Sequence, residues 1–259
     1  MGYLKKYHLD GLDLDWEYPV TGGLPTDTKS PNDRLNFVKL LNDFRNELNQ
    51  RSQSHLLLSV ATTAYPKHIL DLDVKGISAS VDWIGLMAYD LDMSGNQITG
   101  HHAGLFRPSP KDLASKSYAS LNGETAIQTY LKLGAPRRKI VLGVPFYGRS
   151  FKRVENVNHG LSQKFSGRAE TDYEEGSSSY SEIKIKYLPF FERYWDPVVK
   201  SPWLYSAQKK QMFSYEDAES LKIKAKYALN HRLGGIMIWE LNQDDELFTL
   251  LNSIHSVLR

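Results

Sequence analysis

Three carboxylates stand at alternate positions in one short stretch of the sequence. Residues 10–19 read DGLDLDWEYP, which places Asp13, Asp15 and Glu17 at every second position. In a β-strand successive side chains point to opposite faces, so the three carboxyl groups share one face, roughly 6–7 Å apart along the strand. Carboxylates this close cannot all ionise freely, so the pKa of at least one is expected to rise. A carboxyl group that stays protonated near neutral pH is suited to general-acid catalysis.

Two other interpretations of this acidic face are open. An edge strand could present the face to solvent, although the opposite face carries Leu12, Leu14 and Trp16 and the strand ends at Pro19, which stops regular pairing. Aligned carboxylates could also bind a hard cation. The nearby His8 lies at the start of the strand, which is the wrong end for a metal site beside the carboxylates.

Short apolar runs alternate with amphipathic stretches and must position these residues. The predicted strands are 8–16, 56–62, 81–87, 139–144 and 235–239, and the predicted helices are 31–48, 125–132 and 215–231. Apolar strands that are each followed by a helix are typical of a parallel sheet in an α/β protein. Polar and aromatic residues follow nearly every strand, which favours a TIM (β/α)8 barrel. An open doubly wound sheet is the alternative, but no strand is followed by a Gly-rich phosphate turn.

The segment 150–214 breaks this alternation. It is rich in Tyr, Ser, Lys and Glu, and its aromatic residues indicate a folded unit rather than a disordered loop. We therefore expect residues 1–149 and 215–259 to form a partial barrel, and residues 150–214 to form an α+β insertion before the last strand.

Composition limits the classes of partner. The formal net charge is only +2, and the basic residues form no long run, so no global charge directs the chain to nucleic acid or to an anionic membrane. The absence of cysteine excludes disulfides and thiolate metal sites. No stretch approaches the ~20 apolar residues of a membrane span.

The stretch 10–19 resembles the DGxDxDWEYP motif of family 18 glycoside hydrolases, the chitinase family. This resemblance implies a substrate-assisted mechanism. Glu17 would protonate the glycosidic oxygen and later activate water, while the N-acetyl oxygen of the substrate attacks the anomeric carbon. Asp15 would orient the acetamido group, and Asp13 would share a proton with Asp15. The anomeric configuration would be retained, and no cofactor or metal is implied.

Three later stretches are similar to motifs of the same family. Residues 87–90 read MAYD and resemble its M-x-Y-D motif, which implies that Tyr89 and Asp90 bond the N-acetyl group and sugar hydroxyls. Residues 143–149 match G-x-P-x-Y-G-R, which implies that Tyr147 and Arg149 line the cleft. A purely structural salt bridge is an equally open role for Arg149. Residues 234–240 are similar to the last strand, with Trp239 as the floor beneath the sugar.

The remaining residues fall into two groups. Trp16, Tyr18 and Met87 belong to the same motifs and are also expected to bind substrate. His101 and His102 are adjacent in a predicted loop with no obvious acidic partner, so we expect both at the surface rather than on a metal.

The carboxylate motif belongs to the fourth strand of the family's barrel, yet here it begins at residue 10. We therefore expect an N-terminally truncated barrel with its first three strand–helix units missing. Such a chain is expected to be poorly stable and weakly active or inactive, because two strand edges and a half-open core are exposed. No signal peptide is visible, although the resemblance implies secretion.

The leading functional hypothesis is hydrolysis of β-1,4 linkages between N-acetylglucosamine units of chitin or chito-oligosaccharides. One alternative is a catalytically weak or inactive chitin-binding, lectin-like protein. The presence of Glu17 and both aspartates favours the enzyme over this alternative. A further alternative is an endo-N-acetylglucosaminidase that cuts N-glycan cores. The sequence does not distinguish endo from exo action and leaves the oligomeric state open.

Overall fold

The central element of the molecule is a five-stranded parallel sheet. The computed structural model describes residues 2–51, 55–91, 97–109, 118–171 and 176–259. The strands are β1 (Gly11–Asp15), β2 (Leu57–Thr63), β3 (Trp83–Met87), β4 (Ile140–Pro145) and β10 (Gly235–Trp239). They lie in the order β1-β2-β3-β4-β10, and each adjacent pair is parallel. Strands that follow one another across the sheet in chain order fit a segment of a TIM barrel. In a doubly wound sheet the order of the strands reverses partway across the sheet. Within the described residues the sheet is open.

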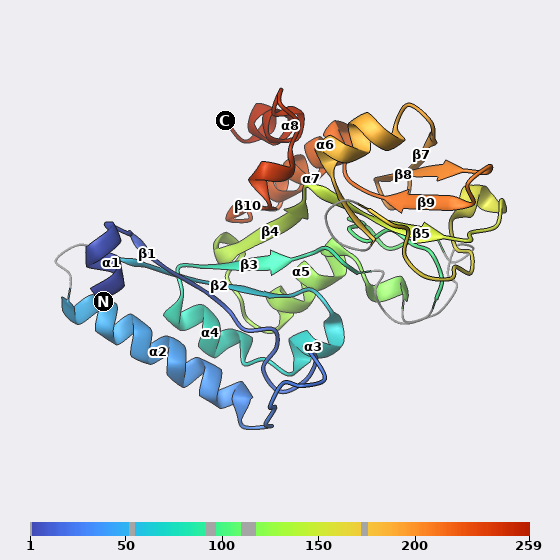
Figure 1. Cartoon of the computed structure of the whole chain (residues 1–259). Helices are drawn as coiled ribbons and strands as arrows, with labels where there is room; N and C mark the ends of the chain where they lie inside the picture. The colour runs from blue at the N-terminus through green and yellow to red at the C-terminus, as the bar shows by residue number, and fades with distance from the viewer. Residues whose placement is uncertain (1, 52–54, 92–96, 110–117, 172–175) are drawn as a thin grey trace.

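Helices cover one face of this sheet. They are α2 (Asp33–Arg51), α3 (Pro66–Leu70), α4 (Val74–Ser80) and α5 (Gly123–Lys132), which lie below the strands in Figure 1. α1 (Gly2–Tyr7) precedes β1, while α7 (Ala218–Asn230) and α8 (Thr249–Leu258) flank β10 in the chain. Among the described residues no helix has both the length and the apolar character that crossing a membrane requires.

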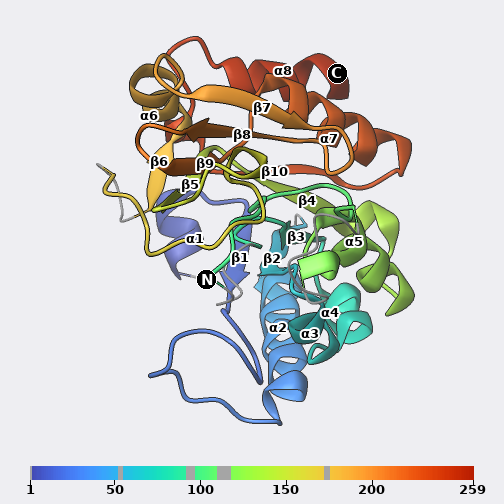
Figure 2. The same ribbon diagram turned by 90° about the vertical axis from the view of Figure 1, so that its right-hand side faces the viewer.

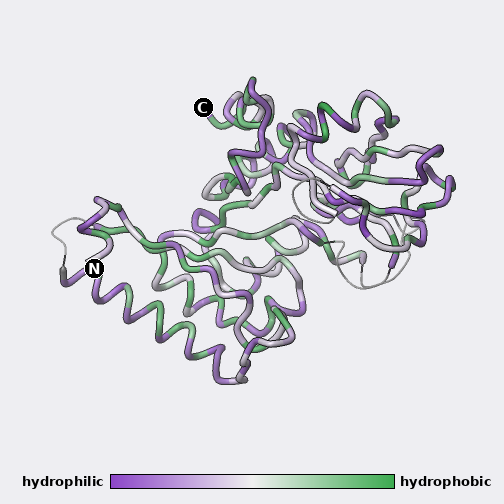
Figure 3. Tube along the Cα trace, in the orientation of Figure 1, coloured by the Kyte–Doolittle hydropathy of each residue, from purple (hydrophilic) through white to green (hydrophobic). Residues whose placement is uncertain are grey.

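The helix α2 shows how the sequence specifies this layer. The Asp33 carboxylate accepts a hydrogen bond from the Ser30 backbone N–H at 2.8 Å, which satisfies a backbone donor at the start of the helix. Phe37, Leu41 and Leu48 form an apolar stripe along the helix, and all three are buried. The hydropathy along α2 accordingly alternates between hydrophobic and hydrophilic (Figure 3).

A second sheet lies beyond the ends toward which β1–β4 point (Figures 1 and 2). Its strands are β6 (Ser177–Ser179), β5 (Tyr147–Lys152), β9 (Gln211–Ser214), β8 (Ser201–Ser206) and β7 (Glu192–Asp196), in that order and all antiparallel. β5 begins at Tyr147, before Ser150, where the insertion was expected to begin. As a result Tyr147 and Arg149 belong to the second sheet, although they directly follow a strand of the first.

Short helical segments complete the chain. α6 (Tyr180–Glu182) runs into a π-helix over Ile183–Tyr187, and 3₁₀ turns occupy Tyr118–Ser120, Arg137–Lys139, Asn158–Gly160 and Leu241–Gln243. The two sheets have adjoining apolar cores. Phe146 and Phe213 are buried in the core that also holds Val144 of β4, so the second sheet is packed onto the first.

Candidate active site

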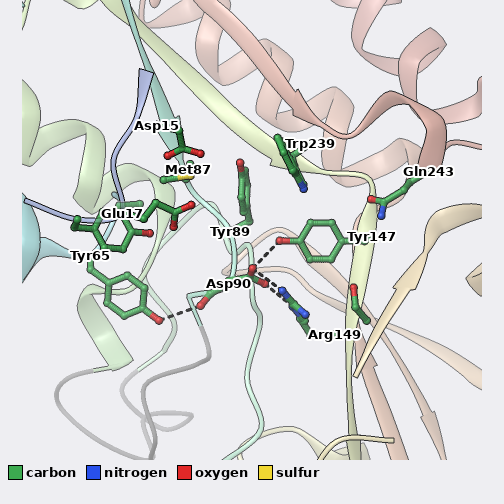
Figure 4. Close-up of a pocket in the computed structure, with 13 residues that line it drawn as sticks. Asp15, Glu17, Tyr65, Met87, Tyr89, Asp90, Tyr147, Arg149, Trp239 and Gln243 are labelled. Carbon is green, nitrogen blue, oxygen red and sulfur yellow. Dashed lines mark hydrogen bonds and ion pairs between the residues drawn. The ribbon is translucent and has the colours of Figure 1, made fainter. Parts of the chain in front are cut away.

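A cavity of about 240 Å³ opens at the carboxyl ends of the parallel strands. Its walls come from β1, β3, β5, β6 and β10 and from the segments that follow β1, β2, β3 and β10. It is lined by Asp15, Glu17, Tyr18, Ala64, Tyr65, Met87, Tyr89, Asp90, Tyr147, Arg149, Ser177, Trp239 and Gln243. Figure 4 shows Asp15 and Glu17 on one side of the cavity, facing Trp239, Tyr147 and Arg149 on the other. Residues that are far apart in the sequence therefore meet at the strand ends, as the position of active sites in TIM barrels leads one to expect.

Two of the predicted site residues lie outside this cavity. Asp13 lies two residues before Asp15 in β1, and its carboxylate accepts a hydrogen bond from the Ser59 hydroxyl. Trp16 packs edge-on against Phe37 of α2, with ring centroids 5.5 Å apart. Because side chains alternate along the strand, Trp16 faces the helical layer rather than the carboxylates. Trp16, which was expected to bind substrate, is therefore not among the residues that line this cavity.

Crowding of the carboxylates changes their ionisation. Burial, and then the negative charges of Glu17 and Asp13, raise the pKa of Asp15 to about 6. The prediction that the pKa of at least one of the carboxyl groups of Asp13, Asp15 and Glu17 rises is therefore confirmed at Asp15. Burial, and then the charge of Glu17, also raise the pKa of Tyr18, while burial and Asp90 do the same for Tyr89. Both phenols thus stay protonated and can donate hydrogen bonds into the cavity.

Asp90 is the centre of a hydrogen-bonded cluster on the opposite wall. Its Oδ1 accepts from Arg149 Nε at 2.6 Å, and its Oδ2 accepts from Arg149 Nη2 at 2.8 Å and from the Tyr147 hydroxyl at 2.8 Å. Burial acts to raise the pKa of Asp90, but the hydrogen bonds from Arg149 and the proximity of His102 prevail and hold the pKa well below its usual range. Arg149 thus combines its two predicted roles, because it is a salt-bridge partner and also lines the cavity.

Sequence reasoning missed several lining residues. Tyr65 follows β2 and donates from its hydroxyl to the Asp90 carbonyl at 2.9 Å, as drawn in Figure 4. Gln243 follows β10 and is buried, with Oε1 unpaired among the described residues. Applying the strand-end rule to these two strands would have found both. Ser177 comes from the second sheet, and no local pattern marks it.

The structure also corrects the placement of His101 and His102. Both are buried, at 2% and 0% exposure, rather than in a surface loop. His101 Nε2 lies 3.3 Å from Asp196, and its ring packs against Trp203 in the second sheet. The His102 ring packs against Tyr147 with centroids 5.4 Å apart. A pair of adjacent polar residues gives no sign in the sequence that a second sheet will cover it.

The arrangement of Asp13, Asp15 and Glu17 does not support the alternative that they bind a metal ion. Among the described residues, no group of three His, Asp or Glu side chains converges closely enough to hold an ion. The carboxylates instead face phenols, an arginine and an indole, which is a typical lining for a site that holds a polar organic ligand.

Comparison with known proteins agrees with this geometry. The chain is 36% identical over 249 residues to chitinase A1 of Niallia circulans, covering 93% of this chain and 36% of that protein. The solved structure of chitinase ChiA74 from Bacillus thuringiensis matches with a TM-score of 0.88 at 32% identity, over 100% of this chain and 45% of that one. A mutant of Ostrinia furnacalis Group II chitinase catalytic domain 2, in complex with penta-N-acetylchitooctaose, matches with a TM-score of 0.88 at 31% identity, over 100% of this chain and 68% of that one.

The family assignment rests on the extent of a further match. The chain spans only about a third of the length of the Niallia relative, so that protein's full activity does not transfer directly. The family model described as Glycosyl hydrolases family 18, however, matches residues 1–244, which hold both the parallel sheet and the second sheet. The chain therefore belongs to glycosyl hydrolases family 18.

Proposed function

We propose that this chain carries the catalytic centre of a chitinase-type glycosidase that cleaves β-1,4 linkages between N-acetylglucosamine units. The observation that carries the proposal is the meeting of Asp15 and Glu17 with Tyr89, Tyr147 and Trp239 in one cavity. Carboxyl groups supply proton transfer, and aromatic rings cover the apolar faces of a pyranose. The bound chito-oligosaccharide in a structural relative supports the same class of substrate.

In this proposal Glu17 is the general acid and base. It protonates the glycosidic oxygen as the bond to the anomeric carbon breaks, and it later takes a proton from the attacking water. The acetamido oxygen of the substrate is the nucleophile, so a second protein nucleophile is not needed. Displacement occurs twice at the anomeric carbon, and the product therefore retains the β configuration.

Asp15 orients the acetamido group in this scheme. Burial and the negative charges of Glu17 and Asp13 raise its pKa to about 6, so it takes up a proton more readily than an ordinary aspartate. Asp13 precedes Asp15 by two residues in β1, accepts a hydrogen bond from the Ser59 hydroxyl and helps to raise the pKa of Asp15 by its charge. In this scheme Asp13 shares a proton with Asp15. Tyr89, Tyr147 and Trp239 bind the sugar at the cleavage point.

The test is product analysis with chitotetraose. We expect the parent chain to release chitobiose whose new reducing end is initially the β anomer, as followed by ¹H NMR before mutarotation. A Glu17→Gln variant should still bind chitotetraose but lose turnover, whereas Glu155→Gln, an exposed change outside the cavity, should not.

Each alternative gives a different result in the same assay. Release of the α anomer would contradict the retaining mechanism. Cleavage of a glycoprotein but not of chitotetraose would favour the N-glycan endoglycosidase, and binding without turnover by the parent chain would favour the lectin-like protein. We propose secretion as well, because chitin lies outside the cells that digest it.

A further inference from the structure

A buried ion pair lies behind the cavity, and the mechanism described above does not use it. Lys224 of α7 and Glu216 are 2% and 1% exposed, with Lys224 Nζ 2.6 Å from Glu216 Oε1. Burying two charges costs several kcal/mol per ion before their attraction is counted, so such a pair is weak evidence of a gain in stability alone. The pair also contacts the loop that contains Ala103, because Lys224 Nζ donates a hydrogen bond to the Ala103 carbonyl at 2.5 Å.

Ala103 directly follows His102, and hydrogen bonds hold both the N–H and the carbonyl of the His102 backbone. The His102 N–H donates to the Ser214 hydroxyl at 2.9 Å. The His102 carbonyl accepts from the Leu91 N–H at 2.8 Å, and Leu91 directly follows Asp90. Together with the contact from Lys224 to Ala103, these bonds attach the loop to β9, to α7 and to the segment after β3 that carries Asp90.

The His102 side chain then reaches the cavity wall from behind. Its ring is fully buried, packs against Tyr147, and places Nδ1 3.5 Å from Asp90 Oδ1. Neither ring nitrogen has a hydrogen-bond partner of normal geometry among the described residues, and the Asp90 carboxylate is the charged group that Nδ1 faces. A buried imidazole nitrogen facing a carboxylate is favourable only if that nitrogen donates, because two acceptors would repel each other in a site of low dielectric.

We propose that His102 is a positioning residue for the active site. Its Nδ1–H holds the Asp90 carboxylate in the orientation that accepts from Tyr147 and Arg149, and the Glu216–Lys224 pair holds the loop that carries His102. The proposal rests on the proposed function, because it assigns to His102 the task of placing two residues that would contact the sugar. His102 does not line the cavity, and so it acts through Asp90 rather than on the substrate.

A first test examines His102 without any substrate. In a ¹H–¹⁵N spectrum of the histidine side chains, we expect Nδ1 of His102 to carry a proton that exchanges slowly with solvent. Asp90→Asn should shift this resonance, whereas it should leave the His231 resonances unchanged. A His102 ring with unprotonated Nδ1 would overturn the proposal, and this outcome does not depend on whether the chain has any glycosidase activity.

A second test measures binding of chitotetraose in a Glu17→Gln background by titration calorimetry. His102→Leu removes the donor at similar volume, and we expect it to weaken binding roughly 10- to 100-fold, the range for a lost hydrogen bond to a charged group. His102→Asn keeps a donor near the position of Nδ1 and should restore affinity to within about threefold of the parent. The buried neighbour His101, which faces away from Asp90, serves as the matched control.

The pattern across these variants decides the matter. His101→Leu should lower the melting temperature yet leave chitotetraose affinity unchanged. Equal loss of affinity in His101→Leu and His102→Leu, or no rescue by His102→Asn, would show a general packing role and overturn the proposal. Failure of the Glu17→Gln parent to bind chitotetraose would count against the proposed function, while the side-chain spectrum would still test His102.

Discussion

At the scale of single residues, Asp15 is a group whose ionised form lowers the stability of the folded protein. Its pKa is raised to about 6 by burial and by the charges of Glu17 and Asp13. An unfolded chain has no such crowding, so its carboxyl would titrate near the ordinary value of 3.8. The ionised carboxylate therefore destabilises the fold, and the cost develops as the pH rises from about 4 to about 6.

Removing this charge should stabilise the protein while harming its proposed activity. We expect Asp15→Asn to raise the free energy of unfolding above pH 6 by about 1 kcal/mol, a figure reduced for the partial exposure of the group. The gain should shrink as the pH falls toward 4, where Asp15 is protonated in both states. Thermal melts of the two proteins between pH 4 and 8 measure this, with Asp43→Asn on the exposed face of α2 as the control. A gain that is independent of pH would contradict the assigned cause.

At the scale of elements, local patterns predicted most of the first sheet. The short, mainly apolar runs of β2, β4 and β10 lie within one residue of the predicted bounds. The alternation in β1 correctly separated Trp16 from the acidic face, although its motif suggested a contact with substrate. The burial of His102 could not be predicted, because it depends on Ser214 and Lys224, which are more than 100 positions away in the sequence.

One arginine joins several elements of the helical layer. Arg45 of α2 donates to the Ser80 carbonyl at 2.9 Å, to the Leu56 carbonyl at 2.8 Å and to Asp82 at 2.6 Å. The same Asp82 carboxylate also accepts from the Leu58 N–H at 2.7 Å, at the start of β2. Arg45 thus fixes α2 against the ends of α4 and β2.

Loss of this arginine should destabilise the layer strongly. Arg45→Met leaves two carbonyls and a carboxylate without their donor, so we expect the free energy of unfolding to fall by about 2–3 kcal/mol. Urea unfolding followed by tryptophan fluorescence measures the change. Arg34→Met on the same helix, which loses one exposed bond to the Leu70 carbonyl, should cost well under 1 kcal/mol in comparison, as is usual for surface sites. Equal effects of the two substitutions would contradict this role for Arg45.

At the scale of the whole molecule, two strand edges are open. β1 and β10 end the parallel sheet, and neither pairs with another strand on its outer side within the described residues. Large apolar side chains lie exposed near β10, including Trp239 at 54%, Leu247 at 73% and Phe248 at 56%. Open edges beside exposed apolar groups favour association between chains.

We therefore expect this chain to self-associate as its concentration rises. Size-exclusion chromatography with light scattering should show a mass that grows with concentration. Leu247→Glu should reduce that growth by placing a charge in the apolar area, whereas Ile185→Glu, at an exposed site in the π-helix that follows α6, should not. A chain that stays monomeric at all concentrations and melts cooperatively would contradict this expectation.

The central claim is that Glu17 transfers the proton in cleavage of N-acetylglucosamine linkages. Its most direct test is turnover of a fluorogenic chitobioside by the parent chain and by Glu17→Gln, at equal protein concentration and with chitotetraose affinity measured for both. We expect measurable turnover in the parent and a loss of about 10³-fold in the variant, with affinity retained, because general-acid catalysis contributes about 10²–10⁴-fold. Turnover that is the same in both proteins would contradict it.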